Sequence, residues 1–218
     1  MRRPAIAFLF AVAVALSGCG GGAGPTADAA ADKSLSSPSL EELMAPGPLG
    51  ERVLGSPNAP VTVIEYASLT CPHCAHFQKD VFPQVKKELI DTGKIRFIVR
   101  EFPIGHTSGA AAIINRCVPE DKYFPLFNAF LLRQPEWVSL EVRPDAIYSV
   151  AKSSGMTRET FDKCLTNQTI IDGLTEVKQR GRRFGVVGTP TFFANGRKAQ
   201  GAITFEEFKA LLGPQSST

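Results

Sequence analysis

The chain has 218 residues, of which 44% are hydrophobic and 21% are charged, an ordinary balance for one globular domain with or without an insertion. Its net charge is +3, and without the two arginines of the first 18 residues the remaining 22 basic and 21 acidic residues leave +1. So small a net charge gives no argument for binding to acidic substrates, and we expect no binding to nucleic acid.

The first 18 residues have the pattern of an export signal. Two arginines precede an apolar run over residues 5–16, and Leu-Ser-Gly at 16–18 is a small-residue cleavage site, so the segment is too short to span a membrane. We therefore expect a periplasmic protein. Leu-Ser-Gly-Cys also resembles the lipobox of bacterial lipoproteins, which implies a lipid on Cys19 that anchors the mature chain to a membrane. The alternative is an ordinary signal peptide whose removal leaves an exposed odd cysteine.

Residues 19–40 are mostly Gly, Ala, Ser, Pro and Thr, with almost no large apolar side chain. Such a composition cannot bury enough surface to fold, so it predicts a flexible tether. Residues 41–60 carry two turn clusters and lead into the globular part. At the other end, residues 214–218 are predicted to form a disordered tail.

A strand, a helix and a second strand follow over residues 61–100. The β-branched run at 61–66 and the apolar run at 95–100 predict the strands, and four-residue apolar steps predict a helix over 72–91. This order favours a parallel, right-handed arrangement of the two strands.

The helix begins at the tetrad Cys-Pro-His-Cys of residues 71–74. Pro72 suits the first helical position, so Cys71 lies at the helix N-terminus, where unpaired N–H groups favour its thiolate.

The tetrad predicts redox chemistry. Cys74 returns beneath Cys71 after one turn, which brings the two sulfurs within bonding reach. His73 adds a titratable ring, and a protonated ring beside the thiolate would stabilise the reduced pair further. A pair whose reduced form is stabilised oxidises other thiols. Because two cysteines supply this chemistry, we expect no cofactor.

The rest of the chain is predicted to consist of a long helical block, a short strand pair and a last helix. Residues 106–184 are predicted to be almost wholly helical, with helices near 144–152, 157–165 and 168–184. Strand character returns at 191–194, and Asn195-Gly196 is a strong hairpin turn into 197–200. Thr204 and Glu207 form a predicted capping box for a last helix that ends at residue 212. A long helical block inside an otherwise compact α/β unit indicates an insertion.

The cysteine count leaves a second possible pair. Five cysteines without Cys19 leave four, so Cys117 and Cys164 remain beside the tetrad pair. Both lie on predicted helices. In an exported protein we favour a structural disulfide between them, which would close a long loop. The alternative is two buried, reduced cysteines that act as small hydrophobes.

The order of elements, the tetrad and the sequence Gly-Thr-Pro-Thr-Phe at 188–192 together resemble the exported thiol:disulfide oxidoreductases of the DsbA type. The resemblance covers about residues 50–213 and implies a thioredoxin fold: an α/β domain with a central sheet of about four to five strands. That domain would comprise residues 41–105 and 176–213. Residues 106–175 would be the inserted helical domain.

The resemblance also assigns roles to residues outside the tetrad. It implies that Pro190 is cis and packs against the active-site disulfide, and that the backbone of Thr189 pairs with an extended substrate segment. Glu65 would be a buried acid beneath Cys74, with a raised pKa, that accepts and returns the proton of that cysteine. The alternative is an edge glutamate that reaches solvent. Some family members carry valine where this chain has Thr189, only some have a second cysteine pair, and lipidation is not general.

These features predict an enzyme that donates its Cys71–Cys74 disulfide to folding exported proteins with free thiols. A membrane partner of the quinone-linked type would reoxidise it, and we expect a monomer. One alternative is an isomerase or reductase on the same fold, although residues 20–60 are too short for the dimerisation domain that isomerases usually bring. The other is copper handling, which the two tetrad cysteines with His73 and His76 could suggest. A closed site needs four ligands, and Cys71, Cys74 and His76 supply three at best, so we expect no metal.

Overall fold

The structure is a computed structural model that describes residues 38–213. The predicted signal peptide, the lipid site at Cys19, the predicted tail and most of the tether lie outside these residues. The predicted tether includes Ser39 and Leu40, but in the structure Ser39 caps helix α1 (Leu40–Met44) through a complete capping box with Glu42. The tether prediction is therefore corrected at its C-terminal end, because a local capping motif outweighs the loop-like composition. Over the described residues, no helix is long and apolar enough to cross a membrane.

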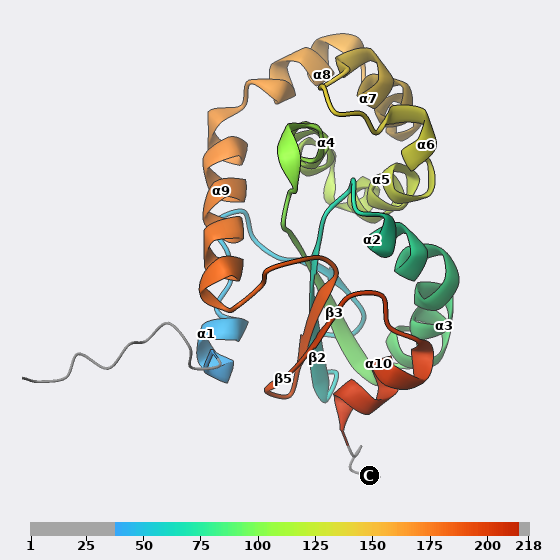
Figure 1. Cartoon of the computed structure of the whole chain (residues 1–218), viewed down its shortest axis with the longest axis vertical. Helices are drawn as coiled ribbons and strands as arrows, with labels where there is room; N and C mark the ends of the chain where they lie inside the picture. Colours follow the sequence, from blue (N-terminus) through green and yellow to red (C-terminus); the bar gives the residue numbers. More distant parts are fainter. Residues whose placement is uncertain (1–37, 214–218) are drawn as a thin grey trace, which may run out of the picture. The chain divides into compact units, whose positions relative to one another are not determined.

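Within residues 38–213, five strands form one mixed sheet in the order β1-β3-β2-β4-β5 (Figure 1). The strands are β1 (Arg52–Leu54), β2 (Val61–Ala67), β3 (Ile95–Glu101), β4 (Thr191–Ala194) and β5 (Arg197–Gln200). β2 and β3 are parallel, and the other three pairings are antiparallel. The expected thioredoxin fold with four to five strands is confirmed. β1 was not predicted, because its three residues lie between two turn clusters and are too few to show an alternation.

One face of the sheet is covered by the helical segment that follows Cys71 and by helix α10 (Phe205–Leu212). The segment consists of α2 (Pro72–His76), the π-helical turn η1 (Phe77–Val81), α3 (Phe82–Val85) and a second π-helical turn η2 (Lys86–Ile90). Phe77 packs against Phe192 of β4 with ring centroids 4.7 Å apart and against Phe208 of α10 at 6.0 Å. This aromatic cluster fixes the active-site helix to the central strands.

The other face is covered by α9 (Gln168–Arg183) and α1 (Figure 1). A Cβ atom at Gly181 would lie 2.8 Å from the ring of Tyr66 on β2, so only glycine allows α9 to approach the sheet this closely. Arg180 of α9 donates hydrogen bonds to the carbonyl oxygens of Glu42, Ala45 and Pro46, which fastens α1 and its loop to this helix.

The helical insertion lies between β3 and α9. Its helices are α4 (Gly105–Cys117), α5 (Glu120–Leu132), α6 (Gln134–Trp137), α7 (Pro144–Ala151), the short 3-10 turn η3 (Lys152–Ser154) and α8 (Arg158–Leu165). Trp137 is fully buried among them, and its indole N–H donates to the carbonyl oxygen of Phe130 at 2.8 Å. The predicted boundary between residues 175 and 176 falls inside α9, because one helix belongs partly to the insertion and partly to the thioredoxin-like domain.

Candidate active site

The two tetrad cysteines occupy different environments at the start of α2. Cys71 is the N-cap residue, Pro72 is at the first helical turn, and the Cys71 N–H donates to the Ser68 carbonyl oxygen at 3.1 Å. Cys71 is partly exposed, whereas Cys74 is fully buried. The helix start therefore presents one sulfur to solvent and hides the other, as the spacing predicts.

The surroundings stabilise the Cys71 thiolate. The pKa of Cys71 is lowered from its ordinary value of 9.0 to about 5, mainly by the hydrogen bond from the Cys74 thiol and in spite of burial. Hydrogen bonds from the Thr189 side chain and from the N–H groups of Cys74 and His73 lower it further. At pH 7 the thiolate thus exceeds the thiol by about a hundredfold. Burial acts the other way on Cys74 and raises its pKa well above the ordinary value.

The loop before β4 reaches the same sulfur. The Thr189–Pro190 peptide bond is cis, as the resemblance implies, and the Cys71 thiol donates to the Thr189 carbonyl oxygen at 3.1 Å. Within the described residues, Thr189 Oγ1 is buried and has no hydrogen-bond partner while Cys71 is a thiol, and it lowers the pKa of Cys71 only by acting on the thiolate. When Cys71 ionises, this hydroxyl is the donor that the loop offers to the sulfur.

Glu65 lies on β2, the central strand, between β3 and β4. Its side chain is only 1% exposed, and its Oε2 atom has no hydrogen-bond partner within the described residues. Burial, with a smaller contribution from the negative charge of Cys71, raises the pKa of Glu65 to about 8. Its charge in turn contributes to the raised pKa of Cys74. Of the two sequence interpretations, the buried acid describes this residue and the solvent-facing edge glutamate does not.

The two tetrad-region histidines are both exposed. It is the backbone N–H of His73 that helps to lower the pKa of Cys71, so a role for its ring stays a prediction. The ring of His76 lies 2.7 Å from the Asp80 carboxylate and is directed along the helix surface. Within residues 38–213 no group of three or more His, Cys, Asp or Glu side chains is arranged to hold a metal ion.

Two residues at the site gave no signal in the sequence. Gln134 of α6 donates through Nε2 to the carbonyl oxygens of Leu69 at 2.7 Å and Cys71 at 3.0 Å. Ser108 of α4 makes a 2.8 Å hydrogen bond with Ser68, three residues before Cys71. A serine in an apolar helix and a glutamine in a loop-like segment are too common to be singled out without their contacts.

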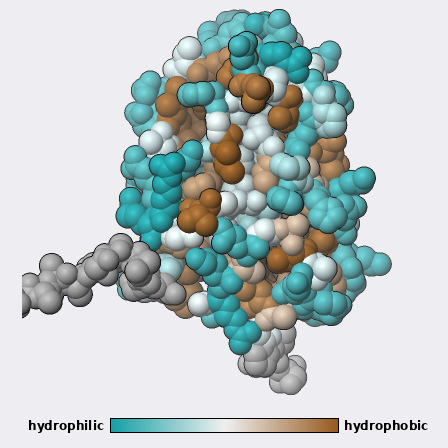
Figure 2. All heavy atoms as spheres, in the orientation of Figure 1, coloured by the Kyte–Doolittle hydropathy of each residue, from teal (hydrophilic) through white to brown (hydrophobic). Residues whose placement is uncertain are grey.

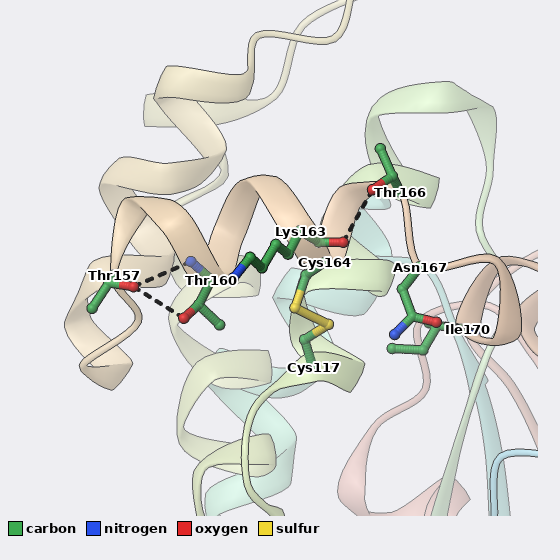
Figure 3. Close-up of a disulfide and its surroundings, with 8 residues drawn as sticks. All are labelled: Cys117, Thr157, Thr160, Lys163, Cys164, Thr166, Asn167 and Ile170. Atoms are coloured by element: carbon green, nitrogen blue, oxygen red, sulfur yellow. Dashed lines mark hydrogen bonds between the residues drawn. A yellow bond between two sulfur atoms is a disulfide. The ribbon is translucent and has the colours of Figure 1, made fainter.

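Cys117 and Cys164 form a disulfide that joins the end of α4 to α8, with Cα atoms 6.1 Å apart (Figure 3). The bond lies within the helical insertion. It links two helices across 47 residues of sequence. This position favours a structural role over participation in exchange at the tetrad.

A groove of about 460 Å³ opens between α4 and α9, and Figure 2 shows apolar residues exposed on this face of the molecule. Its lining is largely apolar and includes Ala110, Ile113 and Leu174. The groove begins beside the active site: Pro103 and Gly105 line it, and the carbonyl oxygen of Ile104 between them accepts a hydrogen bond from Thr70 at 3.3 Å. An apolar surface therefore adjoins the residue before Cys71.

Known proteins share these features. Among curated proteins, a protein of Rickettsia conorii named "Putative protein-disulfide oxidoreductase" is 36% identical to this chain over 150 residues, which are 67% of this chain and 53% of the relative. The chain spans about half the length of such Rickettsia relatives. Disulfide bond formation protein D of Bacillus subtilis is 28% identical over 168 residues, or 75% of this chain and 76% of the relative.

Solved structures give the same result. Alpha-DsbA1 of Wolbachia pipientis has a TM-score of 0.72 at 29% identity, over 80% of this chain and 94% of that protein. BdbD of Bacillus subtilis has a TM-score of 0.69 at 25% identity, over 81% and 94%. The family model described as thioredoxin matches residues 49–213. With that match over more than half its length and its likeness to the DsbA structures, the chain belongs to the thioredoxin family, among the DsbA-type members.

Proposed function

We propose that this protein is an exported thiol:disulfide oxidoreductase that donates the Cys71–Cys74 disulfide to folding proteins. The observation that supports the proposal best is the opposite effect of the site on its two sulfurs, which lowers the pKa of Cys71 and raises that of Cys74. A stabilised Cys71 thiolate favours the reduced pair, and a disulfide whose reduced form is favoured is a strong oxidant.

The reaction proceeds in two exchanges. A client thiolate attacks the exposed Cys71 sulfur of the disulfide; the Cys71–Cys74 bond breaks, and Cys74 leaves with the electron pair. A second client thiolate then attacks the client sulfur of the mixed disulfide, and Cys71 leaves as a thiolate. The client has lost two electrons and gained a disulfide, while the protein has gained two electrons. Cys71 is a good leaving group because its low pKa marks a stable anion.

Glu65 donates a proton to Cys74 during the first exchange. Cys74 is fully buried, so its anion is costly and takes up a proton as it leaves. A buried acid with a pKa of about 8 is protonated at neutral pH and can give that proton, then take it back when the disulfide forms again. A solvent-exposed glutamate would be ionised at this pH and could not act as the donor.

The client is held at two surfaces. The backbone of Thr189, in the loop before β4, pairs with an extended client segment in the manner of an added strand. The groove between α4 and α9 supplies apolar surface next to Thr70, and Ile104 and Val187 add side chains that are 48% and 83% exposed. Folding proteins still expose apolar residues, so these surfaces favour unfolded clients over native ones.

The cellular setting is part of the proposal. The signal-like first 18 residues support export to the periplasm, and a lipid on Cys19 would keep the protein at a membrane. Each turnover leaves the protein reduced, so a membrane partner linked to quinones has to restore its disulfide. The chain would act as a monomer, because exchange at Cys71 needs no second copy.

An isomerase or reductase on the same fold is the second candidate, and the reduction potential separates the two. We expect equilibration with glutathione, followed by alkylation and mass spectrometry, to give a potential well above that of reducing thioredoxins. A potential in the thioredoxin range would overturn the oxidase assignment.

Transfer to a client tests the chemistry directly. The oxidised protein should introduce disulfides into a reduced, unfolded substrate protein, and Cys71→Ser should abolish this transfer. The matched control replaces both Cys117 and Cys164 with serine: it removes the other cysteine pair and should leave transfer intact. If the Cys71→Ser variant transfers disulfides as well as the unaltered protein, the proposed function is wrong.

A further inference from the structure

The turn that presents Cys71, residues 68–71, is held from outside by two helices of the insertion. On one side, Ser108 of α4 bonds to Ser68 Oγ, which also accepts the N–H of Ile104 at 3.2 Å. On the other side, Gln134 of α6 donates to the carbonyl oxygens of Leu69 and Cys71. This active-site turn therefore does not depend on its own sequence alone.

The contact of Gln134 is the more direct of the two. The Cys71 carbonyl oxygen already accepts the first helical hydrogen bond of α2, from Ala75 N–H at 3.1 Å. The same oxygen also accepts a hydrogen bond from the Gln134 amide, at 3.0 Å. The amide thus holds the peptide unit that joins Cys71 to α2, 63 residues away in sequence.

The geometry of that peptide unit determines which hydrogen-bonding groups lie near the Cys71 sulfur. Hydrogen bonds weaken steeply as their angle departs from linear. Cys71 is the N-cap residue of α2, and the N–H groups of His73 and Cys74 in the first turn of this helix help to lower the pKa of Cys71. A rotation of the Cys71 backbone would move the sulfur away from these donors and from Thr189 together.

We propose that Gln134 is a positioning residue that holds the Cys71 sulfur over the first N–H groups of α2, so that the helical insertion sets how stable the thiolate is. The proposal rests on the proposed function for its meaning, since it concerns the sulfur that reacts. Gln134, like Ser108, belongs to the insertion, whereas the reacting cysteines belong to the thioredoxin-like domain.

The test compares Gln134→Ala and Gln134→Glu with the unaltered protein. Thiolate absorbance measured against pH should show the pKa of Cys71 raised by about one unit in Gln134→Ala, a tenfold fall in the ratio of thiolate to thiol. The equilibrium with glutathione should shift by about the same factor toward the oxidised protein, because the reduced form loses the stabilisation. Gln134→Glu should show a larger shift, since a carboxylate cannot donate and adds negative charge beside the thiolate.

Gln168→Ala is the matched control. It removes another glutamine whose Nε2 donates to a neighbour, Asp172, but on the exposed surface of α9, and should leave the Cys71 titration unchanged. Should Gln134→Ala fail to fold, Gln134→Asn keeps the amide and moves it back by one methylene group, and it should also raise the pKa of Cys71.

If Gln134 has only a structural role, the expected result is different. Gln134 variants would then unfold more easily by the same amount in the oxidised and reduced forms, with the Cys71 titration unchanged, and this outcome overturns the proposal. The titration needs no client protein. If the unaltered protein does not oxidise clients, the proposed function fails while the role of Gln134 is still decided by the thiolate measurement.

Discussion

Reduction of the Cys71–Cys74 disulfide should make the protein's stability depend on pH in a way that the oxidised form does not share. In the folded, reduced protein the pKa of Cys71 is about 5, against an ordinary value of 9.0 when the chain is unfolded. Between these values the unfolded state binds more protons, so the stability of the reduced form rises with pH. The contribution is complete above about pH 9 and is lost as the pH falls through 5.

The magnitude follows from the same two values. A pH of 7 is two units above the pKa of Cys71 in the folded protein and two units below its pKa in the unfolded chain. Ionisation of Cys71 therefore adds about 2.7 kcal/mol to the free energy of unfolding at pH 7, relative to acid. Because the Cys71 sulfur is partly exposed, solvent screening reduces this to about 1.4 kcal/mol. For a domain of this size, that corresponds to a shift of about 3–5 °C in melting temperature. Burial is the larger cause of the raised pKa of Glu65 and needs no charge on Cys71, so the part of its opposite pH dependence that comes from burial cancels in the comparison.

The assay is thermal unfolding of the oxidised and reduced forms at matched pH between about 5 and 9. The difference in melting temperature, reduced minus oxidised, should increase steadily over this range. The disulfide's own effect on the unfolded chain is independent of pH and moves the whole curve without changing its slope. The melting temperature of reduced Cys71→Ser should depend on pH in the same way as that of the oxidised protein. A difference that stays constant with pH, or a Cys71→Ser variant that keeps the slope, would refute the assignment of a stabilised thiolate.

Three further predictions concern other parts of the molecule. Glu65→Gln removes the proton donor for the buried sulfur, so disulfide transfer should slow by about tenfold or more and the inflection near pH 8 in its rate should disappear; an unchanged pH profile would exclude Glu65 from the proton step. Loss of the second disulfide through Cys117→Ala and Cys164→Ala should cost about 2–5 kcal/mol in urea unfolding, with thiolate absorbance of the active site unaltered. Gly55→Ala should destabilise by more than Gly50→Ala, because both glycines have positive φ but only at residue 55 would a Cβ lie 2.6 Å from a backbone oxygen of β3; equal losses by chemical denaturation would contradict this.

Local patterns were enough to predict most of the fold. The strand at 61–66 and the hairpin at Asn195-Gly196 depend on neighbouring residues, and the structure has both, with φ of 49° and 73° in the turn. Thr204 and Glu207 form the expected capping box for the same reason. β1 and the α9 boundary were missed because they depend on tertiary contacts: β1 is defined by its pairing with β3, and α9 is one helix across two predicted domains.

The site was only partly predictable, for a related physical reason. The tetrad shows its own chemistry because Cys71, Pro72 and Cys74 are adjacent and the helix start positions them. The contacts that tune the sulfur come from far along the chain: Thr189 is 118 residues away and Gln134 is 63. The motif at 188–192 places the Thr189–Pro190 loop at the active site by resemblance, but not its hydrogen bond to the Cys71 sulfur. Gln134 has an ordinary residue type for its segment, so no pattern in the sequence indicates that it meets Cys71.

Ionisation of Cys71 has to exchange one contact with the Thr189 loop for another. The neutral thiol donates to the Thr189 carbonyl oxygen, whereas a thiolate at the same 3.1 Å would face a lone pair and be repelled. The buried Thr189 hydroxyl, which lacks a partner in the neutral form, can supply the donor that the anion needs. The loop therefore has an acceptor for one protonation state and a donor for the other. Whether the sulfur lies within reach of both depends on how firmly residues 68–71 are fixed. The amide of Gln134 and the loop before β4 therefore act on the same property, the stability of the Cys71 thiolate.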